Sequence, residues 1–247
     1  KDFNLRKSLS ATKVIKVFGP GESQVEDMLA DILENPRGCS IALIAESGEI
    51  LVKVTAEGKD ENDSRKILKQ IIDDMEIKLN RHIYGFDNDK LNEVVAGLLI
   101  EKGKTIALAE SCTGGLLSKY LTDIAGSSKF YWGSVISYSN EAKMELLNVS
   151  AETLAKRGAV SPETAAEMAK GVKVASGADI GLAITGIAGP DGGSAEKPVG
   201  LVYIGIATDN DLVIKELNFV GDRDGIRVLA AKSGLDLVRR YLKYGGH

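Results

Sequence analysis

The sequence predicts an α/β protein of two units, a small α+β unit followed by a larger layered α/β unit with a mixed sheet. The first observation is length, because 247 residues suffice for one to two domains with their own hydrophobic cores. The second is element order, which up to about Gly85 reads strand, helix, strand, strand, helix. The third is the change beyond that point to alternating helices and strands. Residues 84–88 are the expected boundary, with domains at 1–86 and 87–247.

Hydrophobic spacing predicts the helices and strands of the first unit. Residues 14–18 alternate between apolar and polar side chains, as a strand with one buried face does. Two later apolar segments flank Glu-Ser-Gly-Glu at 46–49, which indicates a hairpin. Apolar residues at helical spacing mark two amphipathic helices. The expected order is a strand at 14–18, a helix over 25–33, strands at 40–45 and 50–55, and a helix over 60–81.

In the second unit, short apolar strands alternate with helices, the pattern of a layered α/β domain. Pro162 suits the first turn of a helix, and Thr-Asp-Asn-Asp at 208–211 indicates a hairpin turn. The expected strands are 105–109, 134–138, 180–185, 199–208 and 212–219. The expected helices are 89–102, one that follows a Gly-containing turn and ends at 124, 140–147, 151–157, 161–176 and 224–244.

Composition and charge exclude several classes of function. The 31 Lys and Arg are outnumbered by 35 Asp and Glu, so the net charge is −4, the opposite of the usual balance in a domain held on nucleic acid by phosphate contacts. The two histidines, His82 and His247, and the two cysteines, Cys39 and Cys112, do not stand at zinc-ligand spacing. We therefore expect no metal and no cofactor. Any hydrolase chemistry must run largely without histidine.

The same counts indicate the cellular setting. Two widely separated cysteines do not make a disulfide framework, so a reducing, cytoplasmic setting is expected. No apolar run approaches the ~18 residues of a membrane span, and the first residues are not a signal peptide. The chain also lacks an initiator Met, which favours a piece of a longer protein.

Three short stretches are candidates for chemistry, and each follows a predicted strand. In the first, Ala-Glu-Ser-Cys-Thr-Gly-Gly at 109–115, a strand runs into a polar turn and a helix whose unpaired N–H groups suit an anion or an oxyanion. An ordinary N-cap turn at Ser111 or Thr113 explains the same residues. In the second, Tyr-Ser-Asn-Glu-Ala-Lys at 138–143, Lys143 occupies the first turn of a helix, where acids are usual. A solvated surface lysine is the alternative there.

The third stretch is a Gly- and Pro-rich loop over 185–200, between two apolar strands. Long loops inside compact domains are usually functional or disordered. The loop has neither the Walker A spacing nor the dinucleotide fingerprint. We expect a binding loop, with a flexible surface loop as the alternative.

Taken together, the three stretches predict one site. If their strands are parallel, Ser111, Tyr138 with Lys143, and Thr185 reach the rim of the sheet where ligands bind in open α/β folds. A Ser beside a Lys indicates a nucleophile whose base is an amine. A lysine titrates near ~10.4, and lowering its pKa to about 7.5 costs roughly 4 kcal/mol. A helix N-terminus supplies only about 0.3–1 kcal/mol, so Lys143 must be substantially buried to act as the base.

The stretches at 109–115 and 138–143, with Thr-Gly-Ile-Ala-Gly-Pro-Asp-Gly-Gly…Glu-Lys-Pro-Val-Gly at 185–200, resemble the C-terminal domain of the CinA (competence/damage-inducible protein) family. The resemblance covers about 87–244 and implies an α/β/α layered domain. Residues 1–85 resemble the middle domain of that family, which has KH-like topology. Full-length members carry a further N-terminal domain, similar to molybdopterin-binding proteins, which nothing here matches.

The resemblance implies an amidohydrolase of pyridine nucleotide salvage, which deamidates nicotinamide mononucleotide to nicotinate mononucleotide and ammonia. Ser111 would then be the nucleophile and Lys143 the general base, with Tyr138 and Thr185 supporting them. We expect Tyr138 to hydrogen-bond the Ser–Lys pair and Thr185 to orient Lys143 or the substrate. The N–H groups of Cys112, Thr113, Gly114 and Gly115 are the expected oxyanion donors.

The phosphate of the nucleotide needs donors of its own. The first candidates are the loop glycines Gly186, Gly189, Gly192 and Gly193. Arg223 and Arg227 are the second, since cations are unexpected in a first helical turn. Solvated ion pairs with Asp222 or Asp224 are the alternative. Cys112 is the rival nucleophile, because a helix N-terminus activates a thiolate.

Two rival functions remain open. A nucleic-acid-binding module is suggested by the KH-like element order of residues 1–86, but that segment holds 9 Lys and 4 Arg against 15 Asp and Glu and lacks the Gly-x-x-Gly loop between its helices. A nucleotide-binding protein without turnover is the other rival. The expected partners are the small nucleotide and a second copy of the chain in a homodimer, with no nucleic acid and no membrane.

Overall fold

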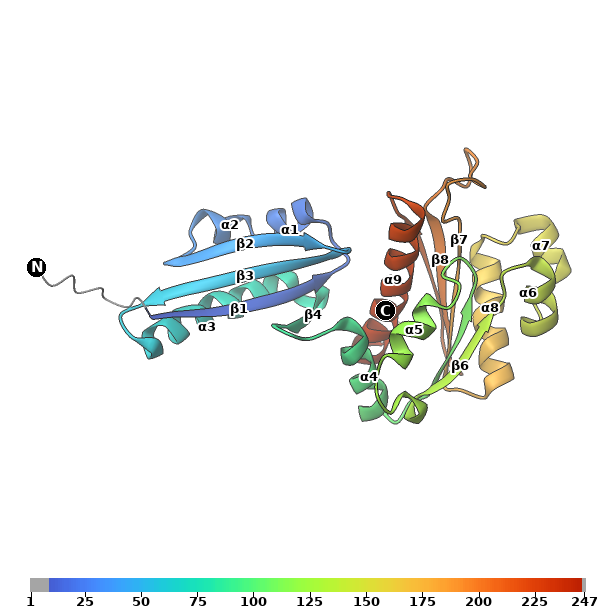
Figure 1. Ribbon diagram of the computed structural model, residues 1–247, viewed down its shortest axis with the longest axis horizontal. Coiled ribbons are helices and arrows are strands. Elements are labelled where there is room, and N and C mark those ends of the chain that lie inside the picture. The colour runs from blue at the N-terminus through green and yellow to red at the C-terminus, as the bar shows by residue number, and fades with distance from the viewer. Residues whose placement is uncertain (1–8, 246–247) are drawn as a thin grey trace, which may run out of the picture. The chain divides into compact units, whose positions relative to one another are not determined.

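The computed structural model describes residues 9–245, so His247 lies outside the described residues (Figure 1). The chain divides into two compact units, with the division after Lys90. One unit carries an antiparallel sheet and the other a mixed sheet. This is the mixed α/β class that the sequence predicts.

The first unit is a four-stranded antiparallel sheet in the order β2-β3-β1-β4, with helices packed on one face. Alternate residues of β3, from Ile50 to Ala56, are buried, so this face carries the core. Its strands are β1 (Leu9–Phe18), β2 (Cys39–Glu46), β3 (Glu49–Gly58) and β4 (Ile83–Phe86). Its helices are α1 (Glu22–Met28), α2 (Ala30–Glu34), α3 (Glu61–Leu79) and the short 3₁₀ turn η1 (Asn80–His82).

Two predictions for this unit need correction. The single helix expected over 25–33 is interrupted at Leu29, which has ψ 7° and is completely buried. Residues 84–86, expected in the boundary segment, belong to β4, which pairs with β1 through Gly85 opposite Lys16. Spacing alone cannot reveal either feature, because one depends on packing of Leu29 and the other on pairing between distant residues.

The second unit is a five-stranded mixed sheet in the order β6-β5-β7-β8-β9, covered by helices on both faces (Figure 1). Strands β6, β5 and β7 are parallel, and β8 and β9 continue the sheet antiparallel. The strands are β5 (Ile106–Glu110), β6 (Tyr131–Ile136), β7 (Ile180–Gly186), β8 (Leu201–Ala207) and β9 (Leu212–Asn218). The helices are α4 (Leu91–Glu101), α5 (Leu116–Thr122), η2 (Ser127–Lys129), α6 (Asn140–Leu147), α7 (Ala151–Arg157), α8 (Pro162–Ser176) and α9 (Arg223–Tyr244).

Every residue of β5 is buried, as expected for a central strand covered on both faces. Small residues let α8 approach the sheet and the neighbouring helix closely. A Cβ on Gly181 would lie 2.2 Å from the carbonyl oxygen of Ala169, and one on Gly171 would lie 2.0 Å from that of Leu147. The second contact seats α6 against α8, and α6 carries Lys143.

Candidate active site

The three chemical stretches meet at one rim of the second sheet. Because β5, β6 and β7 are parallel, their carboxyl ends lie along the same edge. The hydrogen bonds between the strands continue one residue past the ends of β5 and β6. The Ser111 N–H donates to the Ile184 carbonyl at 3.0 Å, and the Ser137 N–H donates to the Glu110 carbonyl at 2.9 Å. The turn that carries Ser111 is thereby fixed to both neighbouring strands.

Ser111 and Lys143 form a buried pair at this rim. The Lys143 Nζ lies 3.1 Å from the Ser111 Oγ, although the two residues come from different elements. Only 1% of Lys143 and 8% of Ser111 are exposed. Lys143 stands in the first turn of α6, which begins after Ser139, whose hydroxyl accepts from the Ala142 N–H at 3.1 Å. Lys143 therefore meets the burial that a lysine base requires.

The surroundings of Lys143 make its side chain easier to deprotonate. Burial lowers the pKa of its ammonium group, and its hydrogen-bond partners are a hydroxyl and two carbonyls, all uncharged. The Nζ lies 2.7 Å from the Ser137 carbonyl oxygen and 3.3 Å from that of Tyr138. A neutral amine has two N–H groups for these carbonyls and one lone pair, which then faces the Ser111 hydroxyl. This is the arrangement that lets an amine remove the proton of a serine.

The N–H groups expected for an oxyanion are only partly available, which corrects the prediction for 112–115. These residues form a turn, and α5 begins at Leu116. The Gly114 N–H donates to the Ser111 carbonyl at 3.1 Å, and the Gly115 N–H donates to the Glu110 carboxylate at 2.9 Å. Within residues 9–245, the N–H groups of Cys112 and Thr113 have no oxygen acceptor. Those two are the donors that remain for an oxyanion.

Cys112 is not an activated thiol, although it was expected at the N-terminus of a helix, where a thiolate is stabilised. Only 6% of it is exposed, and burial raises the pKa of its thiol to about 12. The nearby Glu110 carboxylate raises the pKa further. At neutral pH the side chain is therefore a thiol, which is a poor nucleophile.

The structure places Tyr138 and Thr185 near the pair, and their side-chain hydroxyls bond other groups. The Tyr138 side chain is 64% exposed, and its hydroxyl accepts from Arg223 at 3.3 Å, so Tyr138 contacts Lys143 through its backbone carbonyl. The Thr185 hydroxyl is buried and donates to the Ala159 carbonyl at 2.8 Å. It fixes the end of β7 and does not orient Lys143.

Arg223 and Arg227 extend from the start of α9 and connect the three stretches. Arg227 donates through Nε to the Cys112 carbonyl at 3.2 Å and through Nη2 to the Thr113 carbonyl at 2.9 Å, and its Nη1 lies 3.4 Å from Asp224. Arg223 is exposed and donates to the Gly189 carbonyl at 2.6 Å as well as to the Tyr138 hydroxyl. A guanidinium has five N–H groups, so Arg223 retains three for a ligand, whereas Arg227 is largely used in holding the Ser111 turn.

Most of the loop glycines have a packing reason to be glycine. A Cβ at Gly186 would lie 2.8 Å from the Leu201 carbonyl oxygen, one at Gly189 would lie 2.6 Å from Val199 Cγ1, and one at Gly193 would lie 2.9 Å from the Val199 N. Gly192 has φ +87°, which favours glycine for its backbone conformation. The loop is also anchored, because Lys197 Nζ donates to the Val160 carbonyl at 2.7 Å.

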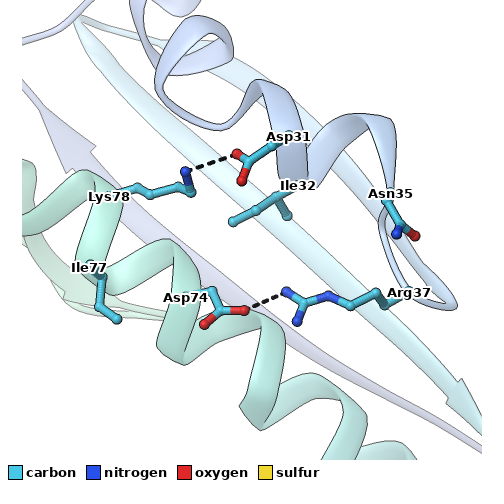
Figure 2. Close-up of a pocket in the computed structure, with 7 residues that line it drawn as sticks. All are labelled: Asp31, Ile32, Asn35, Arg37, Asp74, Ile77 and Lys78. Atoms are coloured by element: carbon cyan, nitrogen blue, oxygen red, sulfur yellow. Dashed lines mark hydrogen bonds and ion pairs between the residues drawn. The ribbon is translucent and has the colours of Figure 1, made fainter.

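A separate cavity of about 490 Å³ lies in the first unit, between α2 and α3. Figure 2 shows that its charged side chains are paired across it, Lys78 with Asp31 at 2.9 Å and Arg37 with Asp74 at 2.6 Å. Its two cations are thus already matched by carboxylates. A polyanion such as RNA would find no net positive charge on this groove.

In the part of the chain that the structure describes, no group of three or more His, Cys, Asp or Glu side chains is placed to hold a metal ion. No helix among these residues is long and apolar enough to cross a membrane. Cys39 and Cys112 are both free thiols.

The chain is thus an α/β protein of two units. The second unit is a three-layer α/β domain with a buried serine–lysine pair, and a small α+β unit precedes it in the sequence. Residues 88–242 match the model of the CinA C-terminal domain, and residues 12–85 match that of the damage-inducible protein CinA KH domain. The chain therefore belongs to the CinA family, as its motifs predict.

Individual relatives agree with this assignment. A CinA-like protein of Syntrophomonas wolfei is 54% identical over all of this chain, and a putative competence-damage inducible protein of Acetivibrio thermocellus is 45% identical over 94% of it. The chain spans 59% and 56% of the lengths of these two relatives. A CinA superfamily structure from Klebsiella pneumoniae is 36% identical with a TM-score of 0.60, covering 62% of this chain and 98% of its own.

A second solved structure, competence/damage inducible protein CihA from Agrobacterium tumefaciens, is 41% identical with a TM-score of 0.57. It covers 60% of this chain and 93% of its own. Both likenesses show the fold of the family. The names of these relatives specify neither a substrate nor a reaction.

Proposed function

We propose that residues 87–247 form an amidohydrolase domain that converts nicotinamide mononucleotide and water into nicotinate mononucleotide and ammonia. The observation that carries the proposal is Lys143 Nζ, buried among uncharged partners and 3.1 Å from the Ser111 Oγ. A serine with a neutral amine at this distance suits acyl transfer at a carboxamide. The choice of substrate rests on the motif resemblance at 109–115, 138–143 and 185–200.

In this reaction Lys143 accepts the Ser111 proton while Oγ attacks the carboxamide carbon. The resulting oxyanion is stabilised by the N–H groups of Cys112 and Thr113, each such donor typically contributing about 2.7–4 kcal/mol. Lys143 returns the proton to the amide nitrogen, the C–N bond breaks, and ammonia leaves. Water, deprotonated by Lys143, then hydrolyses the ester on Ser111 and regenerates the hydroxyl.

Arg223 is the residue we propose for the nucleotide phosphate, with the 186–193 loop beside it. Its exposed guanidinium keeps three N–H groups, which is enough for bidentate contact with phosphate oxygens. Arg227 supports the Ser111 turn from the same helix. The free, buried cysteines are compatible with the cytoplasmic setting that such a salvage reaction implies.

The test is ammonia release together with chromatographic identification of nicotinate mononucleotide, after incubation of the chain with nicotinamide mononucleotide. The proposal predicts equal amounts of both products. Calorimetric binding of the nucleotide without ammonia would instead indicate a binding protein without turnover. We also propose a homodimer, which sedimentation equilibrium would test by mass.

A further inference from the structure

Glu110, which directly precedes Ser111, has no part in the reaction proposed above. It is the last residue of β5 and is completely buried. Its Oε2 accepts from the N–H groups of Gly115 at 2.9 Å and Leu117 at 3.1 Å, and its Oε1 accepts from the N–H of Ser118 at 2.8 Å. The Ser134 hydroxyl on β6 lies 3.3 Å from Oε1. All four donors are uncharged groups, although a buried carboxylate normally requires a cation.

This way of capping a helix differs from the others in the same unit. Helices α6, α7 and α8 begin after Ser139, Ser150 and Ser161, and each serine hydroxyl accepts from an N–H in its own first turn. At α5 the residue before the helix is Gly115, in the left-handed region with φ 93° and without a side-chain cap. The capping group comes instead from Glu110, on the far side of the Ser111 turn. A hydroxyl would be enough to cap the helix, so the longer reach calls for another explanation.

The hydrogen bonds of the Glu110 side chain close a ring that contains the turn with the nucleophile. The carboxylate of Glu110 ties residues 115–118 back to the end of β5, and Ser111 lies inside the segment that is closed. The backbone of Glu110 makes the second connection, because its carbonyl accepts from the Ser137 N–H at 2.9 Å. The Ser137 carbonyl in turn accepts from Lys143 Nζ at 2.7 Å. Glu110 is thus bonded on one side to the nucleophile turn and on the other to the segment that leads to the base.

We propose that Glu110 is a positioning residue that fixes the Ser111 hydroxyl against Lys143 by binding the N–H groups of residues 115, 117 and 118. This inference rests on the proposed function for its catalytic consequence, but the geometry it assigns can be measured without the nucleotide. It also explains which N–H groups remain for an oxyanion. With Gly115, Leu117 and Ser118 occupied by the carboxylate, those of Cys112 and Thr113 are left.

The test compares Glu110→Gln with wild type and with Ser150→Ala. Gln has the same shape but offers one carbonyl oxygen, and its NH₂ group would face backbone donors, so the turn loses at least one bond. Ser150→Ala removes the cap of α7, a helix that holds neither Ser111 nor Lys143, and serves as the control for a simple loss of helix stability. We expect Glu110→Gln to lower kcat for nicotinamide mononucleotide at least tenfold while KM changes less than threefold. Ser150→Ala should leave both values within twofold of wild type.

A second readout keeps this proposal separate from the proposed substrate. Labelling of Ser111 by an alkyl fluorophosphonate measures how well the hydroxyl is placed and activated, whatever the natural substrate is. We expect Glu110→Gln to be labelled at least tenfold more slowly than wild type and Ser150→Ala at the wild-type rate. If wild type is labelled but releases no ammonia, the proposed function fails and the positioning role is still decided by the labelling rates.

Two results would overturn the role of Glu110. One is wild-type kcat and wild-type labelling in Glu110→Gln. The other is a parallel loss in Glu110→Gln and Ser150→Ala that follows their melting temperatures. Should the Gln variant not fold, Glu110→Asp carries the same expectation, because its carboxylate is one methylene too short to bind all three N–H groups. Wild-type labelling of Glu110→Asp would then refute the proposal.

Discussion

Replacing Lys143 tests most of the chemistry proposed for this site. An unperturbed lysine titrates near ~10.4, so at pH 7.4 about 0.1% of it is neutral. Burial to 1% exposure among a hydroxyl and two carbonyls lowers the pKa of Lys143, and each unit of lowering raises the neutral fraction about tenfold. A general base typically contributes about 10²–10⁴-fold to the rate. Lys143→Met, similar in shape but without a basic amine to take the proton, should lose that factor.

The assay is ammonia release from nicotinamide mononucleotide between pH 5.5 and 9.5. For wild type, kcat/KM should rise with pH, because deprotonation of Lys143 generates the base, and should level off at an apparent pKa below the 10.5 of an ordinary lysine. Lys143→Arg should stay inactive over this range, since a guanidinium remains protonated. Lys156→Met, at an exposed lysine of α7, is the matched control and should behave as wild type. A Lys143→Met variant that loses less than tenfold, or a wild-type profile without the rise, would refute the reasoning.

Three further predictions concern Arg223, Cys112 and the stability of a Lys143 variant. Arg223→Ala should raise KM for the nucleotide about tenfold but leave KM for the phosphate-free riboside unchanged, and equal changes would exclude a phosphate role. Alkylation of Cys112 by iodoacetamide at pH 8 should be much slower than that of a free cysteine, because the pKa of its thiol is raised to about 12, and rapid substrate-protected inactivation would contradict this. Lys143→Met should raise Tm at pH 7, because burial in the folded state disfavours the ammonium form of Lys143. This cost in the free energy of folding is full below the pKa of Lys143 in the folded state and fades as pH rises toward 10.5, the pKa of an ordinary lysine. A rise in Tm seen only above pH 10 would contradict the prediction.

Much of the second unit is predictable because its signals are local. The helices at 140–147 and 151–157 have the expected bounds, since serine caps and regular apolar spacing define them. The meeting of Ser111 with Lys143 is predictable as well, because each follows a strand and the strands β5 and β6 are parallel. A rule about strand ends is therefore enough to bring the two residues together.

What the sequence does not reveal depends on where side chains point. Glu110 belongs to the motif at 109–115, but its binding of three N–H groups depends on the turn geometry of 111–115. The sequence feature that could indicate this role is a glutamate a few residues before the Gly-Gly pair at which a helix begins. Tyr138 is directed away from the pair because it follows the edge strand β6, where its ring is exposed and meets Arg223. The Tyr138–Arg223 contact joins distant residues, so no local pattern marks it.

The break at Leu29 has the same origin. Residues 25–33 have continuous helical spacing, but the N–H of Leu29 bonds the carbonyls of both Val25 and Glu26, and the chain turns there to keep Leu29 in the core. The gain from burying Leu29 is tertiary and does not show in local helical spacing. Propensity therefore predicts one helix where packing makes two.

The most direct measurement of the central claim is the rate of ammonia release from nicotinamide mononucleotide by Ser111→Ala and Cys112→Ala, side by side with wild type. If Ser111 is the nucleophile, Ser111→Ala should lose at least about a thousandfold in kcat, because nucleophile removal costs more than the loss of a single positioning contact. Cys112→Ala should remain within about tenfold of wild type, the change reflecting packing of a buried thiol. Wild-type ammonia release by Ser111→Ala, or loss of release in Cys112→Ala alone, would contradict the account.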